Sequence, residues 1–256
     1  MTMDDGGQIF GKVRHAETTP LGGDARRRSM QETFSQIYES GAWTLPGGSS
    51  EVDVSLSGPG SNLQQTAALR AELPRLVADL GIRSFLDAPC GDYFWMSRVD
   101  LGVESYVGVD VVPEVIHRNR DRFAGPGRDF RVLDIIQDQI PPVDLIFSRD
   151  CLVHFNDDNV RRALEQFKKS GAKYLATTTF VGRTENAEDI VAGGWRPLNL
   201  SIAPFALPQP IRVIDEQCTE VYKYNKDGVK IKGGEDVREE RRFSDKAIGI
   251  WRIADL

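Results

Sequence analysis

The stretch Ser84-Phe85-Leu86-Asp87-Ala88-Pro89-Cys90-Gly91-Asp92-Tyr93-Phe94-Trp95-Met96 decides how this chain is organised. An apolar run ends at Asp87 and turns sharply through Pro89 and Gly91. This pattern predicts a buried parallel strand whose carboxyl end opens into a ligand-binding loop. The dinucleotide fingerprint G-x-G-x-x-G is absent, because Pro89 stands where its first glycine would be. Its absence disfavours a pyrophosphate site, and with it a nicotinamide-dependent oxidoreductase.

Strands and helices are predicted to alternate from residue 84 to residue 180. The further strands are expected at 105–110, 129–133, 143–148 and 174–180, and the helices at 114–123 and 157–169. This alternation predicts an α/β fold in which helices cover both faces of a parallel sheet. Residues 212–219 and 246–253 read as two more strands of an antiparallel ending, which brings the sheet to seven strands.

The chain is expected to form one domain over residues 29–256, preceded by an arm at 1–28 that we predict to be disordered. Residues 29–83 form an N-terminal helical segment. Its first helix runs from Met30 to near Gly41. Its second is capped by Ser61 or Asn62, closes at Gly81, and is bent or split by Pro74.

The last part of the domain, residues 181–256, departs from the strand and helix alternation. Residues 181–210 read as a long irregular insertion, which we interpret as a wall facing the substrate. The charged segment 223–242 is expected to be an exposed hairpin or a flexible flap, and a role for it as a lid stays open.

Composition excludes several classes of partner. The formal net charge of −6 gives no basic field for nucleic acid or an anionic membrane, so a small molecule is the expected partner. Cys90, Cys151 and Cys218 lack metal-ligand spacing, which favours a reduced, cytoplasmic protein. Residues 1–25 lack the apolar stretch of a signal peptide.

Acidic residues close the first three predicted strands. Asp110 follows Asp87 by 23 positions, and Asp134 follows the third strand. The carboxyl ends of neighbouring parallel strands meet at one edge, so the three carboxylates are expected to converge there. Asp87 offers a negative charge suited to a cationic amino group. An acid at the offset of Asp110 commonly accepts hydrogen bonds from both hydroxyls of a ribose.

The sequence Asp87-Ala88-Pro89-Cys90-Gly91 resembles motif I of the class I S-adenosylmethionine-dependent methyltransferases. The resemblance implies a Rossmann-like, doubly wound seven-stranded sheet, S-adenosylmethionine as cofactor, and residues 84–180 as the cofactor-binding core. It also implies that the residue at position 134 accepts from the adenine amino group while its neighbours flank the ring. The cofactor-binding residues implied in this way are Asp87, Pro89, Gly91, Asp110, Val111, Asp134, Ile135 and Arg149. Tyr93 replaces the third glycine of the motif, which places it near the methionine moiety and the acceptor.

Four further stretches resemble a bacterial subgroup of small methyltransferases that includes a mycobacterial methylmannoside 1-O-methyltransferase. They are Ile37 to Trp43, Ser57 to Ser61, Asp150 to His154, and Trp195 to Leu200. The resemblance implies O-methylation of a small hydroxylated metabolite, with a saccharide as the first choice, and a homodimer. It gives residues 57–61 the role of a lid over the cofactor, although a plain connector remains an alternative.

Methylation of a hydroxyl needs a base or a metal, because an alcohol is too weakly acidic to attack at neutral pH. His154 follows the fourth strand and is the best base; the alternative is a core or helix-cap histidine. Asp150 orients His154, binds substrate hydroxyls or holds Mg²⁺ together with Asp144 or Asp134; the alternative is an ion pair with Arg149 or Arg161. Trp195 either stacks on a sugar ring or packs under a loop.

Two other functions remain open at this stage. One is a catalytically silent module that keeps an S-adenosylmethionine pocket for regulation. The other is a methyltransferase of a non-sugar acceptor. A silent module would be favoured if the side chains of His154 and Asp150 pointed away from the cofactor.

Overall fold

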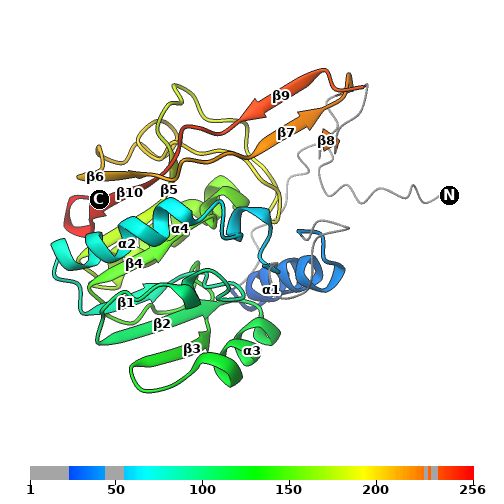
Figure 1. Ribbon diagram of the computed structural model, residues 1–256. Helices are drawn as coiled ribbons and strands as arrows, with labels where there is room; N and C mark the ends of the chain where they lie inside the picture. Colours follow the sequence, from blue (N-terminus) through cyan, green and yellow to red (C-terminus); the bar gives the residue numbers. More distant parts are fainter. Residues whose placement is uncertain (1–22, 44–54, 228–229, 232–235) are drawn as a thin grey trace.

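The computed structural model describes residues 23–43, 55–227, 230–231 and 236–256. Residues 1–22 of the arm expected at 1–28, and residues 44–54, lie outside the described residues. The fold is a central twisted sheet with helices on both faces, and the red C-terminal strand lies next to one edge of the sheet (Figure 1).

The central sheet has seven strands in the order β3-β2-β1-β4-β5-β10-β6. The first five strands in the chain are parallel: β1 (Ser84–Asp87), β2 (Ser105–Asp110), β3 (Arg128–Val132), β4 (Leu145–Ser148) and β5 (Tyr174–Phe180). Strand β10 (Lys246–Arg252) inserts antiparallel between β5 and β6 (Arg212–Asp215). This confirms the predicted seven-stranded α/β sheet with an antiparallel ending.

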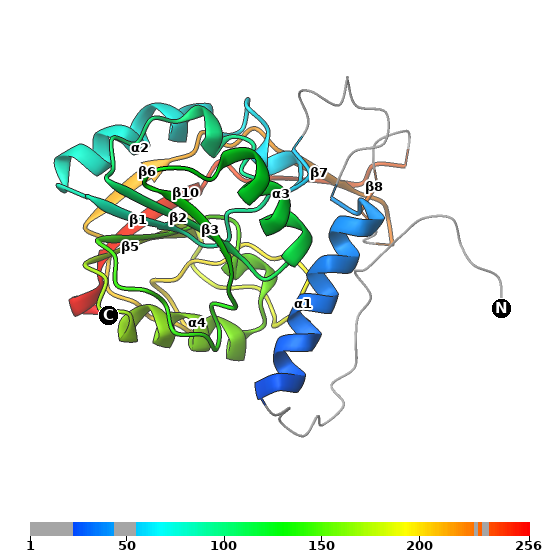
Figure 2. The same ribbon diagram turned by 90° about the horizontal axis from the view of Figure 1, so that it is seen from below.

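In the described part of the chain, four α-helices pack around this sheet: α1 (Gly23–Ser40), α2 (Ala67–Asp79), α3 (Pro113–Phe123) and α4 (Asp157–Lys169). Helix α2 lies on one face and α4 on the other, while α1 stands across the end of the molecule (Figure 2). The hydrophobic cores follow this division. Phe85 of β1 packs with the buried leucines of α2, and its neighbour Leu86, pointing the other way, packs with α1 and α4.

Two helix boundaries differ from the expectation. Helix α1 begins at Gly23, so residues 23–28, which we had assigned to the arm, are helical. Helix α2 begins at Ala67, because Asn62 caps an irregular turn before it, where its Oδ1 accepts from Gln65 N at 2.8 Å. Pro74 does not split α2. The proline forfeits one backbone hydrogen bond, and burial of four apolar side chains on the sheet offsets it: Leu69, Leu73, Leu76 and Val77.

The charged segment 223–242 belongs to a second, three-stranded antiparallel sheet with the order β8-β7-β9. Strands β7 (Val221–Tyr224) and β9 (Glu239–Arg242) form a ribbon that projects from the body, with β8 (Lys230–Ile231) beside β7 (Figure 1). The predicted hairpin is therefore present. Strand β6 ends at Asp215 instead of reaching Thr219, because Glu216 turns inward to an arginine.

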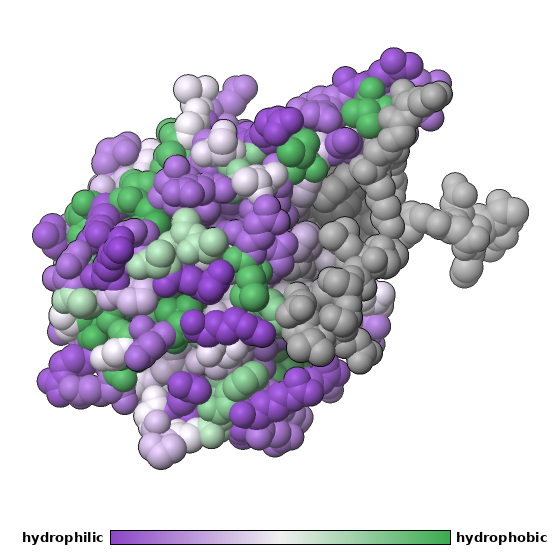
Figure 3. All heavy atoms as spheres, in the orientation of Figure 1, coloured by the Kyte–Doolittle hydropathy of each residue, from purple (hydrophilic) through white to green (hydrophobic). Residues whose placement is uncertain are grey.

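Hydrophilic side chains predominate on the face shown in Figure 3, with apolar side chains scattered among them. None of the helices in the described part of the chain has the length and apolar character that a membrane span requires.

Candidate functional site

Gly91 is the tightest point of the loop that follows β1. Its φ of +52° is a conformation that side chains rarely adopt, and a Cβ placed there would lie 2.3 Å from Ser57 Oγ. The Gly91 N–H donates to Asp110 Oδ2 at 3.2 Å. The glycine is therefore required by two things, the turn itself and the close approach of the segment at 55–61.

Asp92 fastens that segment to the loop, and sequence reasoning missed it. Its carboxylate accepts hydrogen bonds from Ser55 Oγ at 3.0 Å, Leu56 N at 2.6 Å and Ser57 Oγ at 3.1 Å. Asp92 N donates back to Ser57 Oγ at 2.9 Å. The partners are 35 to 37 residues apart in the chain, so no local pattern signals the contact. Residues 55–61 therefore lie over the loop, and we call this segment the strap.

Tyr38 of α1 completes this strap and is a second residue that the sequence did not single out. Its hydroxyl lies 2.8 Å from Ser57 Oγ and 3.3 Å from the position of a Cβ on Gly91. Burial and the nearby Asp110 carboxylate raise the pKa of Tyr38 well above its usual value, so the phenol stays neutral. Helix α1 thus brings a hydrogen-bonding hydroxyl to the edge of the β1 loop.

Asp87 and Asp110 lie side by side at the ends of β1 and β2. The Tyr106 hydroxyl donates to Asp87 Oδ2 at 2.5 Å, and Val112 N donates to Asp110 Oδ1 at 3.0 Å. Burial raises the pKa of Asp87 to about 7 and that of Asp110 to about 6, and the charge of Asp110 adds to the rise at Asp87. Two buried carboxyl groups therefore stand at neighbouring strand ends on the same edge of the sheet.

Asp134 reaches the same edge from the end of β3. Its Oδ1 accepts from Ile136 N at 3.0 Å, and its Oδ2 accepts from Gln137 Nε2 at 2.7 Å. Burial raises the pKa of the Cys151 thiol, and the charges of Asp110 and, to a smaller extent, Asp134 add to the rise. Cys151 therefore lies in the field of both acids. The three carboxylates expected to converge do share one edge of the sheet.

The residues at this edge fit an adenosyl cofactor. The carboxylates of Asp110 and Asp134 stand at neighbouring strand ends, and the backbone of Gly91 leaves no side chain in the way. Val111 is half-buried beside Asp110, and Ile135 is buried beside Asp134; both pack on the apolar core. Pro89 lies in the loop between Asp87 and Gly91.

His154 lies on a short turn after β4, at the same edge. Its Nδ1 is 2.6 Å from the carbonyl oxygen of Gly194, and its ring lies against Trp43 with 5.1 Å between centroids. Because a carbonyl only accepts, Nδ1 carries the proton and Nε2 keeps a lone pair. Burial lowers the pKa of His154, so the imidazole is neutral at pH 7.

Asp150 is held in place by two cations. Lys246 Nζ lies 2.7 Å and Arg149 Nη1 3.2 Å from Asp150 Oδ2. Its φ is +51°, and its N–H donates to Thr178 Oγ1 at 2.8 Å. Burial works to raise the pKa of Asp150, but Lys246 and Arg149 outweigh it and hold that pKa well below its usual range. The expected ion pair with Arg149 exists, whereas Arg161 pairs with another aspartate.

The guanidinium of Arg149 contacts protein groups, and its expected cofactor-binding role remains a prediction. Its Nε and Nη2 donate to Glu216 Oε2 at 3.0 and 2.7 Å, and Nη2 also donates to the carbonyl oxygen of Gly60 at 2.9 Å. With Nη1 on Asp150, each guanidinium nitrogen already contacts a protein oxygen. The buried side chain of Arg149 therefore ties the far end of the strap to the sheet.

Tyr93, which we expected near the acceptor, is a core residue. At a φ of +56° its ring turns away from the edge and packs on Tyr106, Phe123 and Phe130, with centroids 5.0 to 5.3 Å apart. Only 3% of its surface is exposed, and burial raises its pKa to about 12. The missing glycine of the motif thus marks a packing change and not a substrate contact.

Trp195 packs in a small aromatic cluster with Phe180, Tyr222 and Phe243, at centroid distances of 4.9 to 6.1 Å. It follows Gly194, whose carbonyl oxygen lies 2.6 Å from His154 Nδ1. Its predicted sugar-stacking role remains a prediction.

The predicted magnesium pair of Asp150 and Asp144 is wrong. Asp144 precedes β4 at the opposite edge of the sheet, where it accepts from Lys173 Nζ at 2.7 Å and from the backbone of Arg83 and Ser84. Asp150 follows β4, so the whole strand separates the two carboxylates. Across the described ranges, no group of three or more His, Cys, Asp or Glu side chains is placed to hold a metal ion.

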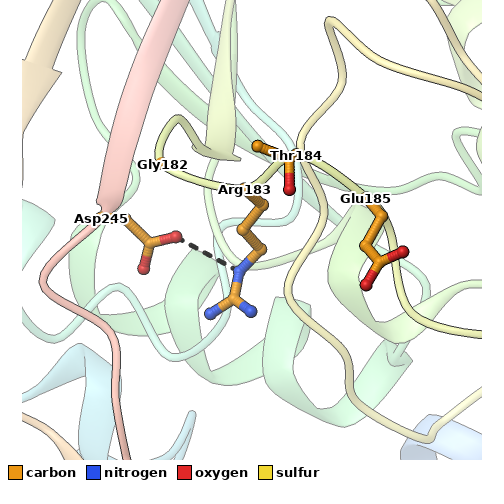
Figure 4. Close-up of a pocket in the computed structure, with 5 residues that line it drawn as sticks. All are labelled: Gly182, Arg183, Thr184, Glu185 and Asp245. Atoms are coloured by element: carbon orange, nitrogen blue, oxygen red, sulfur yellow. Dashed lines mark ion pairs between the residues drawn. The ribbon is translucent and has the colours of Figure 1, made fainter.

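A polar hollow of about 300 Å³ opens where the insertion begins after β5. It is lined by Gly182, Arg183, Thr184, Glu185 and Asp245. Figure 4 shows the Arg183 guanidinium between the carboxyl groups of Glu185 and Asp245, and Arg183 Nε lies 3.2 Å from Asp245 Oδ2. Asp245 precedes Lys246, so this hollow and Asp150 lie at the same edge of the sheet.

Known proteins resemble this chain in structure and not in sequence. No family model and no curated protein sequence matches it. The 1,6-didemethyltoxoflavin-N1-methyltransferase of Burkholderia thailandensis, solved with its acceptor and S-adenosylhomocysteine, has a TM-score of 0.52 and 16% identity over 92% of both chains. The N-methyltransferase NodS of Bradyrhizobium japonicum WM9, solved with S-adenosylhomocysteine, has a TM-score of 0.50 and 16% identity over 86% of this chain and 97% of that one.

A third match, the methyltransferase domain of the bacterial protein CtHen1-C, is 17% identical at a TM-score of 0.41. This chain spans 66% of that domain, and the likeness is too low to support an argument. The two matches with TM-scores of 0.52 and 0.50 are methyltransferase structures, and the seven-stranded sheet described above is consistent with their fold. The chain has the Rossmann-like fold of the class I S-adenosylmethionine-dependent methyltransferases.

Proposed function

We propose that this protein is an S-adenosylmethionine-dependent O-methyltransferase of a small hydroxylated metabolite. A saccharide is the preferred acceptor, and the 1-hydroxyl of a mannoside is the first one to test. The proposal depends on the position and the hydrogen bond of His154. Its Nδ1 is engaged by a backbone carbonyl at the edge of the sheet where Asp110 and Asp134 stand, which leaves Nε2 as a base.

When bound, the cofactor supplies an electrophilic methyl group on a sulfonium. The protein has to hold the acceptor oxygen in line with the S–CH₃ bond and remove its proton. His154 Nε2 takes that proton, and the Gly194 carbonyl supports the positive charge that then forms on the ring. Asp150, ionised by its two cations, provides a fixed acceptor of hydrogen bonds from further hydroxyls.

The cofactor itself is assigned to the edge beneath the strap. In this proposal Asp110 accepts from the ribose hydroxyls, Asp134 accepts from the adenine amino group, and Asp87 faces the cationic amino group. The burial of Asp87 and Asp110 supports the assignment, because a cationic group or a pair of hydroxyl donors would stabilise their ionised forms. The strap at 55–61 acts as the lid.

A nitrogen acceptor is the second candidate, because the two structures reported above with TM-scores of 0.52 and 0.50 are named as N-methyltransferases. A neutral imidazole serves either acceptor, since an amine also has to lose a proton. A silent cofactor-binding module is the third possibility. We further propose that the protein is cytoplasmic and that it works as a homodimer. Light scattering of the purified chain tests the oligomeric state directly.

Two measurements separate these functions. Calorimetry with S-adenosylhomocysteine tests the cofactor site, and the absence of binding at millimolar concentration would refute the whole proposal. Mass spectrometry then follows the gain of one methyl group on a panel of mannosides, other sugars, phenols and amines. Transfer to oxygen supports the proposal and transfer to nitrogen supports the second candidate. Tight cofactor binding without transfer to any acceptor supports the silent module.

A further inference from the structure

A buried lysine from the last strand reaches the acceptor end of the proposed site. Lys246 opens β10, and only 5% of its side chain is exposed. Its Nζ lies 2.7 Å from Asp150 Oδ2 and 3.7 Å from Glu216 Oε2. The cost of burying an ammonium is large, so a lysine in such a place needs closely matched anions.

The backbone of the strap passes close to this ion pair at Gly60. A Cβ on Gly60 would lie 3.2 Å from Asp150 Oδ2, 3.7 Å from Glu220 Oε2 and 3.8 Å from Lys246 Nζ, so the Glu220 carboxylate lies near the pair as well. Arg149 closes the cluster by bridging Asp150, Glu216 and the Gly60 carbonyl. Asp150 thus has one orientation, in which both cations hold Oδ2.

This ion pair affects the pKa of His154, which follows Asp150 by four residues. The other groups packed on the ring carry no charge: they are Phe34, Trp43 and the Gly194 carbonyl. Burial is the main cause that lowers the pKa of His154; of the charged groups, Asp150 raises this pKa and Lys246 lowers it. An unbalanced Asp150 carboxylate would favour the imidazolium, which has no lone pair to offer as a base.

We propose that Lys246 is a positioning residue of the acceptor site: its ammonium fixes the Asp150 carboxylate and offsets part of its charge, so that Asp150 does not draw the buried, neutral His154 toward its imidazolium form. The inference rests on the proposed function for its meaning in catalysis. The electrostatic link itself is a property of the protein alone, and it can be measured without cofactor or acceptor.

The test is an NMR titration of the histidine ring Cε1–H signals of the full chain. Only His15, His117 and His154 are present, so single substitutions of the first two identify the signal of His154. Lys246→Met is expected to raise the pKa of His154 by about 0.5 to 1, since Arg149 keeps Asp150 ionised. Lys246→Arg, which restores the charge, is expected to return it to the wild-type value. Asp150→Asn is expected to lower it.

Lys173→Met is the matched control, because Lys173 makes an equally short 2.7 Å pair with Asp144 at the opposite edge of the sheet. Its removal is expected to leave the pKa of His154 unchanged. Equal titrations of the Lys246→Met and wild-type proteins would overturn the inference. If Lys246→Met fails to fold, Lys246→Gln takes its place, because its neutral amide can still donate a hydrogen bond to Asp150. The same upward shift is expected, and its absence refutes the idea.

Activity supplies the second readout. In Lys246→Met the acid limb of the kcat/KM profile should move to higher pH by the same amount as the NMR titration, while affinity for S-adenosylhomocysteine stays within about twofold. A purely structural lysine would lower activity equally at all pH values, and that result would refute the positioning role. If the wild-type protein transfers no methyl group but the NMR shifts occur, the proposed function fails and the electrostatic link stands.

Discussion

Replacing Asp87 by Asn should make the protein more stable at alkaline pH and should have a smaller effect at acid pH. Asp87 has 3% of its surface exposed, and burial raises its pKa to about 7. In the unfolded chain the pKa is about 3.9. Between these two values the folded state keeps a proton that the unfolded state has lost, so the free energy of unfolding falls as the pH rises.

The size of the effect follows from that difference. A change of about 3 in pKa corresponds to about 4 kcal/mol when the carboxyl group is ionised in both states. Between about pH 5 and about pH 8.5, ionisation of Asp87 should lower the free energy of unfolding of the wild type by about 2 to 3 kcal/mol. An asparagine stays neutral throughout, and its side-chain oxygen still accepts the hydrogen bond that Tyr106 gives to Asp87.

The assay is urea unfolding of the cofactor-free protein, followed by tryptophan fluorescence at both pH values. The advantage of Asp87→Asn over the wild type should grow by about 2 to 3 kcal/mol between about pH 5 and about pH 8.5. Asp144→Asn is the control, because Lys173 holds the pKa of Asp144 well below its usual range and Asp144 is ionised over the whole interval. The control should lose a constant amount of stability. A difference between Asp87→Asn and wild type that does not change with pH would refute the reasoning.

Three further predictions concern the site. Gly91→Ala should weaken S-adenosylhomocysteine binding at least about tenfold and cost about 1 to 3 kcal/mol of stability, because the added Cβ meets the strap at a strained φ; calorimetry with unchanged affinity would contradict this. Asp92→Ala should speed amide exchange in residues 55–57 at least about tenfold, whereas Asp100→Ala, which removes a turn acceptor outside the site, should leave it unchanged. His154→Ala should lower turnover by about 10² or more at saturating cofactor with intact cofactor affinity, and wild-type turnover would exclude it as the base.

Local patterns in the sequence were enough to predict the core of the fold. The apolar run at 84–87 and its successors specify buried strands, since alternate side chains of each strand meet helices on both faces. The acids at the ends of β1, β2 and β3 could be placed together for a topological reason. Parallel neighbours bring their carboxyl ends to one edge whatever the connecting helices contain.

Side-chain direction and long-range polar pairing were decided only by the tertiary structure. The sequence does not show that Tyr93 takes a positive φ and turns into the core, or that β4 separates Asp144 from Asp150. The bonds from Asp92 to the strap and from Lys246 to Asp150 join residues 35 to 37 and 96 positions apart. Periodicity reports which face of an element is buried, because burial depends on the local repeat. The partner of a buried charge depends on which distant segments the folded sheet brings together, and no local repeat carries that information.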